Sequence, residues 1–358
     1  MAQNSATYTI GWVGLGNMGL PMAQNLQSLL SQAAANAEVA GRLPFPVHPS
    51  LVVYNRTQAK CASVVELGAT AVSSVAEVAR TCDLIFTSLT NDQTVRSVYN
   101  ELLPTLRARQ EQGLLQTRSV FLIETSTTSP QLATELSSQV QLLASGQSSN
   151  HPVYFLRCPV FGAPVAAQSA SLVWVLSGPA PACVALKSIV IPALGRGAIE
   201  VGEDPVQGSN MKLLGNFFIG STVETLSEAA VLAEKAGLGT AKMAEFVEWM
   251  FPFGTYLLYS RKMVRPEEPQ PDGFITDVGF SIDLCLKDVN LIRELARKNN
   301  CQLPTMDAFH RHLTTVQSRG HNDWDWSSAV AALRWEAGLP GYYNDTTFPK
   351  PDGNLHQP

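Results

Sequence analysis

Short hydrophobic runs alternate with amphipathic stretches along the first two hundred residues. The runs are rich in Val, Ile, Leu and Phe, and the stretches between them carry apolar residues at helical spacing. This alternation predicts parallel βαβ units whose sheet is covered by helices on both faces. The expected strands span residues 9–13, 51–55, 84–89, 120–124, 153–157, 173–177 and 199–201.

The pattern changes at about residue 204. Residues 208–237 form a proline-free stretch that predicts one long helix, and the chain stays helical in pattern to about residue 337. The sequence therefore predicts an α/β domain with a doubly wound sheet over 1–203, an all-α domain over 204–337 and an irregular tail over 338–358. Within the first domain, residues 41–50 contain one glycine and three prolines and read as an inserted surface loop.

Composition narrows the class of protein. The chain has 358 residues, 45% of them hydrophobic, and a net charge of −5 without a block of like charges. Two globular domains fit this length, and binding to nucleic acid or to a membrane surface through charge is not expected. The N-terminal residues resemble no leader segment, and no apolar run is long enough to span a bilayer. A soluble, cytoplasmic protein is expected, and its six scattered cysteines predict no metal site.

A glycine motif follows the first hydrophobic run. Gly14, Gly16 and Gly19 enclose Asn17 and Met18 in the pattern Gly-x-Gly-x-x-Gly, with a strand predicted before it and a helix after it. Such a turn lets the backbone approach a dinucleotide pyrophosphate, which the free N–H groups of the helix N-terminus can bind. The alternative is a tight strand-to-helix turn that binds nothing.

The end of the second predicted strand indicates which dinucleotide is bound. Asn55 stands where an NAD-binding domain carries Asp or Glu, and Arg56 and Thr57 follow it. An acidic residue would repel a 2′-phosphate, whereas Arg and Thr can bind one. The sequence therefore predicts that NADP is the cofactor.

Polar residues follow two further predicted strands at their carboxyl ends. Leu89 ends one strand and is followed by Thr90 and Asn91, and Ser126 follows the next strand. Open α/β sheets bind ligands at this edge, so these residues are expected to contact cofactor or substrate. Helix capping is the alternative, and it is the preferred role for Ser129, which precedes a proline.

Lys212 and Asn216 lie four positions apart near the start of the long helix. Residues at this spacing project from one face of a helix. A lysine whose charge is disfavoured can exchange a proton near neutral pH, and the asparagine can hold a substrate oxygen. The alternative is a solvated lysine on the protein surface.

From about residue 10 to 333 the chain resembles the β-hydroxyacid dehydrogenase family, which includes 3-hydroxyisobutyrate and 6-phosphogluconate dehydrogenases. The resemblance consists of six motifs in order. They are 14–19 with 22–26, 55–57, 124–130, 159–164, Lys212 with Asn216, and Lys287 with Asp288 ahead of a helix.

This resemblance implies a Rossmann-type domain joined by a long helix to an all-α domain, assembled as a homodimer or homotetramer. It implies that Lys212 is the catalytic acid or base and that Asn216 binds substrate beside it. Lys287 would lie near the nicotinamide, and Arg56 would bind the 2′-phosphate.

One segment departs from the family pattern Asp-Ala-Pro-Val-Ser-Gly-Gly. This chain has Arg157 at the first position and Phe161, Gly162 and Ala163 at the last three. The family's Ser binds the substrate carboxylate, and phenylalanine cannot donate that hydrogen bond. A more apolar substrate, or one held by the backbone N–H groups of Gly162 and Ala163, is expected at this loop.

The sequence therefore predicts an NADP(H)-dependent oxidoreductase. It would interconvert a small β-hydroxy acid or related alcohol with its aldehyde or ketone by hydride transfer, with Lys212 as general acid and base. Two alternatives stay open. The first is an imine reductase or reductive aminase, which the altered loop favours, although these relatives usually lack the lysine. The second is a non-catalytic NADP-binding protein, which the altered loop also favours.

Overall fold

A computed structural model describes residues 7–114, 118–144, 152–264 and 270–348. The chain divides into two compact units, Met1–Leu213 and Leu214–Pro358. The division falls inside helix α9 (Pro205–Lys235), whereas the sequence places the boundary just before this helix. Residues 349–358, which belong to the expected tail, lie outside the described residues.

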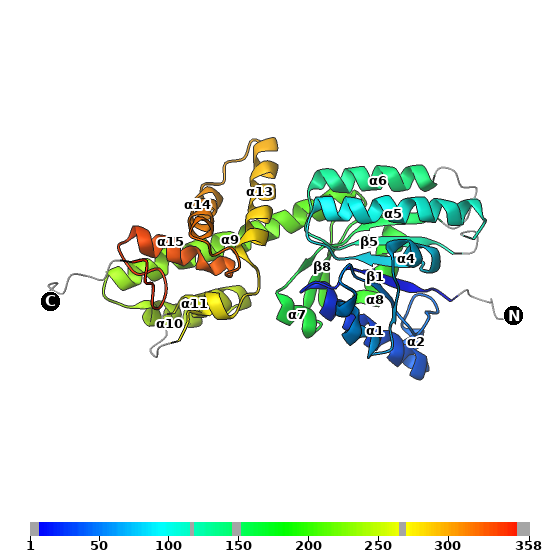
Figure 1. Ribbon diagram of the computed structural model, residues 1–358, viewed down its shortest axis with the longest axis horizontal. Helices are drawn as coiled ribbons and strands as arrows, with labels where there is room; N and C mark the ends of the chain where they lie inside the picture. The colour runs from blue at the N-terminus through cyan, green and yellow to red at the C-terminus, as the bar shows by residue number, and fades with distance from the viewer. Residues whose placement is uncertain (1–6, 115–117, 145–151, 265–269, 349–358) are drawn as a thin grey trace. The chain divides into compact units, whose positions relative to one another are not determined.

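The first unit contains a six-stranded parallel sheet in the order β3-β2-β1-β4-β5-β6. Figure 1 shows β1 and β5 of this sheet among the helices. The order reverses direction between β1 and β4, which is the position at which such sheets bind ligands. The strands are β1 (Ile10–Val13), β2 (Val52–Tyr54), β3 (Thr70–Ala71), β4 (Leu84–Thr87), β5 (Val120–Glu124) and β6 (Val153–Arg157).

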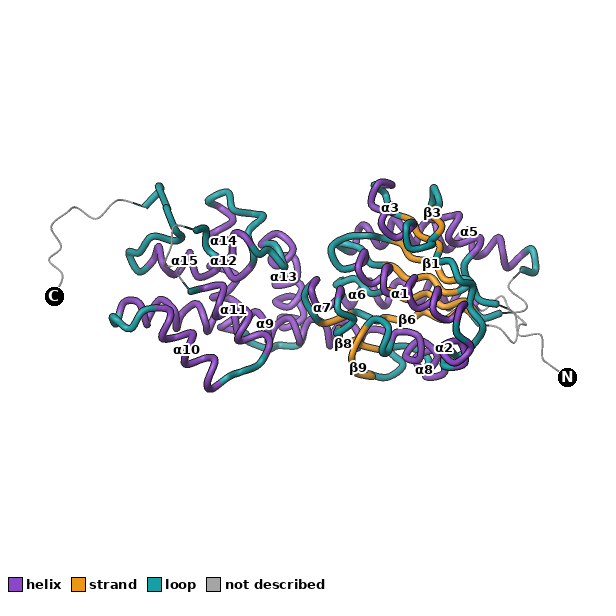
Figure 2. The backbone as a smooth tube through the Cα atoms, turned by 90° about the horizontal axis from the view of Figure 1, so that it is seen from below, coloured by secondary structure: helices purple, strands orange, loops and turns teal. Residues whose placement is uncertain are grey.

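Helices cover both faces of this sheet, as the buried residues of β5 illustrate. Phe121 and Ile123 join one hydrophobic cluster with α1 and α8, while Val120 and Leu122 join another with α4, α5 and α6. Side chains alternate between the faces of a strand, so a strand buried on both sides must be apolar throughout. Figure 2 shows the strands lying among these helices. The helices are α1 (Gly19–Ala35), α2 (Ala37–Gly41), α3 (Ala62–Val65), α4 (Val75–Thr81), α5 (Asp92–Glu111), α6 (Pro130–Ala144), α7 (Pro164–Gln168) and α8 (Ala180–Val190), with a 3₁₀ turn η1 (Gln58–Cys61).

The Rossmann-type doubly wound sheet expected from the sequence is confirmed, with two differences. The last expected strands form a separate sheet in the order β7-β8-β9, in which β7 is antiparallel to β8. Neither β3 nor β7 was predicted, because each has only two residues. The strands of this second sheet are β7 (Val160–Phe161), β8 (Leu172–Leu176) and β9 (Gly195–Glu200).

The insert at residues 41–50 is a surface loop, as the sequence predicts, and contacts with Tyr8 anchor it. It is preceded by helix α2, and the Phe45 ring stacks on Tyr8 with ring centroids 3.9 Å apart. Val47 forms a parallel bridge with Tyr8, and the N–H of His48 donates to the Tyr8 carbonyl at 2.8 Å. The insert therefore packs on the amino end of β1.

The regular elements in the described part of the second unit are helices, as the sequence predicts, and residues 338–348 after the last helix are irregular. The helix predicted over 208–237 is α9, and Gly220 on it packs so tightly against α14 that a Cβ would lie 3.1 Å from the Phe309 ring. The described part of the chain contains no helix long and apolar enough to cross a bilayer. The other helices are α10 (Thr240–Met250), α11 (Gly254–Met263), α12 (Gly273–Thr276), α13 (Ile282–Lys298), α14 (Pro304–Ser318) and α15 (Ala329–Glu336), with a 3₁₀ turn η2 (Trp326–Ser328).

Candidate functional site

The three glycines of the turn after β1 have different physical roles. Gly14 has a φ of +101°, and a Cβ there would lie 2.2 Å from the Ser88 carbonyl oxygen. At Gly19 a Cβ would lie 2.1 Å from the Gly14 oxygen, so this glycine allows α1 to pack on the turn. At Gly16 a Cβ would meet no protein atom within 4 Å. No side chain fits at Gly14 or Gly19, whereas the space beside Gly16 is free of protein atoms. This free space fits the approach of a pyrophosphate.

Asn55, at the end of β2, is tied to this turn. Its Oδ1 accepts a hydrogen bond from the Leu15 N–H at 2.9 Å, and its Nδ2 donates to the Thr57 carbonyl at 2.9 Å. A carboxylate could not make the second bond, because it has no proton to donate. The side chain therefore holds the glycine turn and the 55–57 loop together. Arg56 and Thr57 are exposed beside it.

The loops after β4 and β5 meet at the same edge of the sheet. The Leu89 N–H donates to Ser126 Oγ at 2.8 Å, which joins the two loops. Asn91 caps α5 by accepting from the Thr94 N–H at 2.9 Å, and Thr90 is exposed before it. The structure thus gives Asn91 and Ser126 structural hydrogen bonds, while their predicted contacts to cofactor or substrate stay predictions.

Ser129 is the N-cap of α6, as the sequence predicts. Its Oγ accepts from the Leu132 N–H at 3.1 Å. It also donates to the Asp92 carboxylate at the start of α5, at 2.5 Å. The capping hydroxyl therefore fixes the starts of two neighbouring helices.

Lys212 is half-buried near the start of α9. Its Nζ donates to the Val160 carbonyl at 2.8 Å and lies 4.6 Å from the centroid of the Phe161 ring. The ring is therefore placed for a cation–π contact with the ammonium group. This geometry excludes the alternative of a freely solvated surface lysine and brings Phe161 to the predicted acid or base. Gly162 and Ala163 follow Phe161, and Gly162 has a φ of +136° that requires glycine.

The second unit holds the remaining predicted residues. Asn216 is buried on α9, and its Nδ2 donates to Asp288 Oδ2 at 2.7 Å. Lys287 pairs with the other carboxylate oxygen of Asp288 at 2.8 Å. The sequence places Lys287 ahead of a helix, whereas it lies inside α13. One buried carboxylate thus orients both polar side chains.

Comparisons with known proteins match both parts of the chain. Residues 48–202 match the family described as the NAD binding domain of 6-phosphogluconate dehydrogenase. Residues 206–333 match the family described as NAD-binding of NADP-dependent 3-hydroxyisobutyrate dehydrogenase. The NADH-dependent oxidoreductase ucdB of Aspergillus ustus is 30% identical, over 81% of this chain and 92% of that protein.

The chain belongs to the β-hydroxyacid dehydrogenase family.

A further relative and two solved structures are also similar to this chain. The mitochondrial 3-hydroxyisobutyrate dehydrogenase of Drosophila melanogaster is 26% identical over 94% of this chain and 92% of its own. The crystal structure of 3-hydroxyisobutyrate dehydrogenase from Salmonella typhimurium shares the fold with a TM-score of 0.70 at 20% identity, covering 90% of this chain and 99% of that chain. An imine reductase from Pseudomonas sp. also shares the fold, with a TM-score of 0.51 at 16% identity, covering 92% of this chain and 100% of that chain.

As a member of this family, the protein is an NAD(P)-binding oxidoreductase that acts on CH–OH groups. The open Gly16 and the helix N-terminus behind it fit the pyrophosphate of either dinucleotide. These residues would hold the cofactor at the carboxyl edge of the sheet.

Two buried polar contacts, one in each unit, are not evident in the sequence. One is the Asp288 contact with Asn216, which joins residues 72 positions apart. The other is a network centred on Arg157, whose side chain is 1% exposed and pairs with Glu124. Burial raises the pKa of the Glu124 carboxyl, and Arg157 opposes that rise. The segment containing Arg157 departs from the family pattern. The partners of Arg157 depend on strand register, which the sequence does not show.

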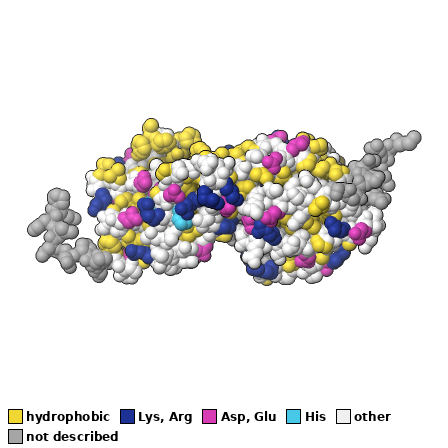
Figure 3. Space-filling model, turned by 90° about the horizontal axis from the view of Figure 1, so that it is seen from above, with side chains coloured by type: hydrophobic (Ala, Val, Ile, Leu, Met, Phe, Trp, Pro, Cys, Tyr) yellow, Lys and Arg dark blue, Asp and Glu magenta, His cyan; other side chains and the backbone are white. Residues whose placement is uncertain are grey.

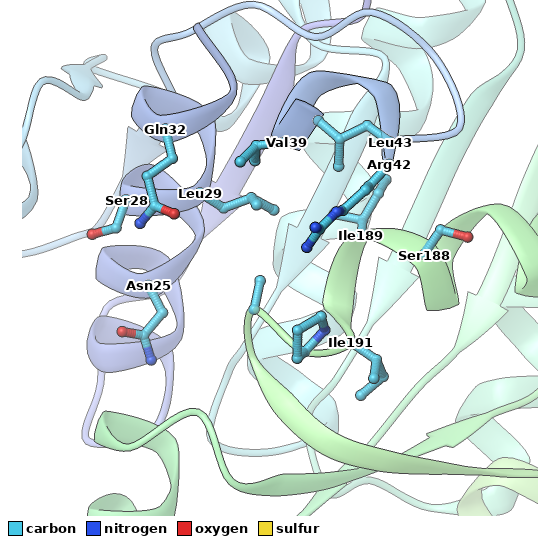
Figure 4. A pocket seen from close by; sticks show the side chains of 12 residues that line it. Asn25, Ser28, Leu29, Gln32, Val39, Arg42, Leu43, Ser188, Ile189 and Ile191 are labelled. Carbon is cyan, nitrogen blue, oxygen red and sulfur yellow. The ribbon is translucent and has the colours of Figure 1, made fainter. Parts of the chain in front are cut away.

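A groove elsewhere in the first unit contains none of the predicted site residues (Figure 4). Its volume is about 480 Å³, and it lies between α1, α2 and the end of α8. Leu29 and Ile189 line it, and Arg42, which pairs with Glu38 at 2.6 Å, reaches over it. The groove is therefore separate from the candidate dinucleotide site.

Proposed function

We propose that the protein interconverts a β-hydroxy acid or related alcohol with its aldehyde or ketone, using NADP(H). The observation that carries this proposal is the placement of Lys212. Its half-buried amino group is oriented by the Val160 carbonyl and the Phe161 ring rather than extending into solvent. Such a fixed amino group suits proton exchange with a substrate oxygen.

In this proposal the nicotinamide, when bound, accepts hydride from the substrate carbon or returns it. The protein's own residues position the substrate and move one proton. In oxidation Lys212 accepts the hydroxyl proton, and in reduction it returns that proton to the oxygen. Asn216, held by Asp288, keeps an amide oxygen available to the substrate.

The preference for NADP is supported by the residues after β2. Arg56 is exposed there, and the carboxamide of Asn55 replaces a carboxylate that would repel a 2′-phosphate. The family descriptions name both nucleotides, and the Aspergillus relative is described as NADH-dependent. Arg56 is therefore the feature of this chain that favours NADP.

Phe161 indicates which class of substrate this site would accept. Its ring lies beside Lys212 Nζ, so the group next to the reacting carbon would contact an apolar surface. This surface disfavours a carboxylate at that position, because a desolvated charge without a hydrogen-bond donor is costly. It is also the observation that favours an imine or iminium substrate as the second candidate function.

The test is NADPH oxidation against a panel of semialdehydes, β-keto acids, ketones and cyclic imines, with wild type and Lys212→Ala. We expect turnover of a carbonyl substrate and a loss of about 10²–10⁴ in kcat for Lys212→Ala, with NADPH affinity retained. Lys187→Ala, which removes an exposed lysine paired with Glu200, is the matched control. Full activity of Lys212→Ala would refute its role as acid or base. Turnover of imines alone would establish the second candidate, and tight NADPH binding without any turnover would indicate a non-catalytic protein.

We also propose that the protein forms a homodimer or homotetramer. Large apolar side chains are exposed around α10 of the second unit. Figure 3 shows hydrophobic side chains gathered on this second unit. Trp249 is 81% exposed, and Phe246 and Phe253 are more than half exposed. Exposed patches of this kind are typical of protein interfaces. Light scattering of wild type and Trp249→Glu measures the mass, and a wild-type monomer would contradict the proposal.

A further inference from the structure

Arg157 and Glu124 occupy paired positions at the carboxyl ends of neighbouring strands. Glu124 is the last residue of β5, Arg157 is the last residue of β6, and the two are partners in the register. Both side chains are 1% exposed. A buried ion pair of this kind is costly to desolvate, so it persists only where further hydrogen bonds satisfy both groups.

Those further hydrogen bonds connect two loops and a helix. Arg157 donates from Nη1 to the Glu124 carbonyl at 3.1 Å and to its carboxylate, from Nη2 to the Ser126 carbonyl, and from Nε to Ser209 Oγ at 2.9 Å. The other carboxylate oxygen of Glu124 accepts from the Ser126 N–H at 2.9 Å. Ser126 is thus held from both sides of its backbone.

The first turn of α9 is pressed against the same arginine. Gly208 lies so close that a Cβ would be 2.7 Å from the Arg157 carbonyl oxygen and 3.0 Å from its Cγ. Ser209 is completely buried and lies three residues before Lys212, on the same side of the helix. Lys212 in turn donates to Val160, three residues after Arg157.

We propose that Arg157 is a positioning residue for the reaction. Together with Glu124, it couples the Ser126 loop to the first turn of α9 and so fixes where Lys212 lies relative to that loop. This inference rests on the proposed role of Lys212. It also means that the guanidinium is committed to four protein acceptors and does not serve as the receptor for a substrate carboxylate.

A purely structural role is the competing explanation, and the chain offers a matched comparison. Arg109 and Asp83 form a second buried pair in the same unit, at 3.2 Å. Arg109 also donates to the carbonyls of Ala79 and Cys82, at 2.8 and 2.6 Å. This pair contacts none of the predicted site residues, so its removal reports the stability effect alone.

The experiment compares Glu124→Gln/Arg157→Met with Asp83→Asn/Arg109→Met. Removing both partners avoids leaving one buried charge unpaired, so both double variants should fold. We expect the first to lower kcat by at least 30-fold at unchanged NADPH affinity, and the second to keep wild-type kcat per folded molecule. Ser209→Ala, which removes only the Nε contact, should lower kcat by about tenfold, since one hydrogen bond contributes roughly that factor.

Hydrogen exchange supplies a measurement that does not depend on turnover. Amides of residues 205–213 and 124–130 should exchange faster in Glu124→Gln/Arg157→Met than in wild type, and at the wild-type rate in the control. Unchanged exchange and kcat in the first double variant would overturn the proposal, as would equal losses in both variants. If no substrate is turned over, the proposed function fails, while the exchange data still decide whether Arg157 couples the loop to the helix.

Discussion

Gly16 and Gly19 provide a direct test of the dinucleotide site, because alanine at each position should have a different effect. At Gly19 a Cβ would lie 2.1 Å from the Gly14 carbonyl oxygen, more than 1 Å inside van der Waals contact. Both groups are backbone, so helix α1 must move away from the turn. At Gly16 the same methyl group meets nothing within 4 Å.

These distances set the expected magnitudes. Overpacking against rigid backbone costs about 3 kcal/mol, which corresponds to a fall in Tm of roughly 6–12 °C for a unit of this size. Gly16→Ala should change Tm by less than about 2 °C, because an exposed, unstrained substitution costs only about 0.5 kcal/mol. Its methyl group projects about 1.5 Å into the space that the pyrophosphate would use. Loss of one charge-assisted hydrogen bond then weakens binding by about 10- to 150-fold.

The measurements are thermal unfolding of the protein without nucleotide and calorimetric titration with NADPH and with NADH. We expect Gly16→Ala to keep the wild-type Tm and to bind both nucleotides more weakly. We expect Gly19→Ala to have a lower Tm than the wild type. Wild-type affinity of Gly16→Ala for both nucleotides would refute the pyrophosphate assignment. A loss of Tm in Gly16→Ala equal to that in Gly19→Ala would refute the packing argument.

The other predictions concern the cofactor, the amide and the substrate loop. Arg56→Ala should raise the KM for NADPH at least tenfold and leave that for NADH unchanged, with the exposed Arg80→Ala as control; equal effects on both nucleotides would contradict a phosphate contact. Asp288→Ala should lower kcat/KM by about 10- to 150-fold by freeing the amide of Asn216, whereas Asp288→Asn keeps an acceptor and most of the activity; equal losses would show that the hydrogen bond is not the cause. Phe161→Ser should lower the KM for β-hydroxy carboxylates about tenfold, and steady-state kinetics showing no change would exclude Phe161 as a determinant of specificity.

The sequence predicted the sheet well because its strands are buried on both faces. Runs such as the one at residues 120–124 contain almost only large apolar residues, which few other structures accommodate. The two-residue strands β3 and β7 carry no comparable pattern. The insert is the loop that its prolines predict, whereas the packing of Phe45 and Val47 against the core is not evident in the sequence.

The residues of the candidate site could be named from the sequence, whereas the contacts between them could not. Lys212 could be named as a candidate because the motif that contains it has a defined residue type and spacing. The partners of Arg157 could not be named, because the pairing with Glu124 depends on the register of β5 and β6. The same holds for Asp288, whose contact with Asn216 depends on how two helices pack.

The insert before β2 shows which end of this domain tolerates a change in length. Its Val47 forms an isolated bridge with Tyr8, two residues before β1, and the chain enters the sheet at Val52 in register with Gly11. The added residues therefore lie at the amino edge of the strands, and Asn55 still reaches Leu15 at the carboxyl edge. Searches that demand a fixed spacing between the glycine turn and the ribose-binding position would overlook this chain. Strand register, rather than the number of intervening residues, brings Asn55 to the glycine turn of the candidate site.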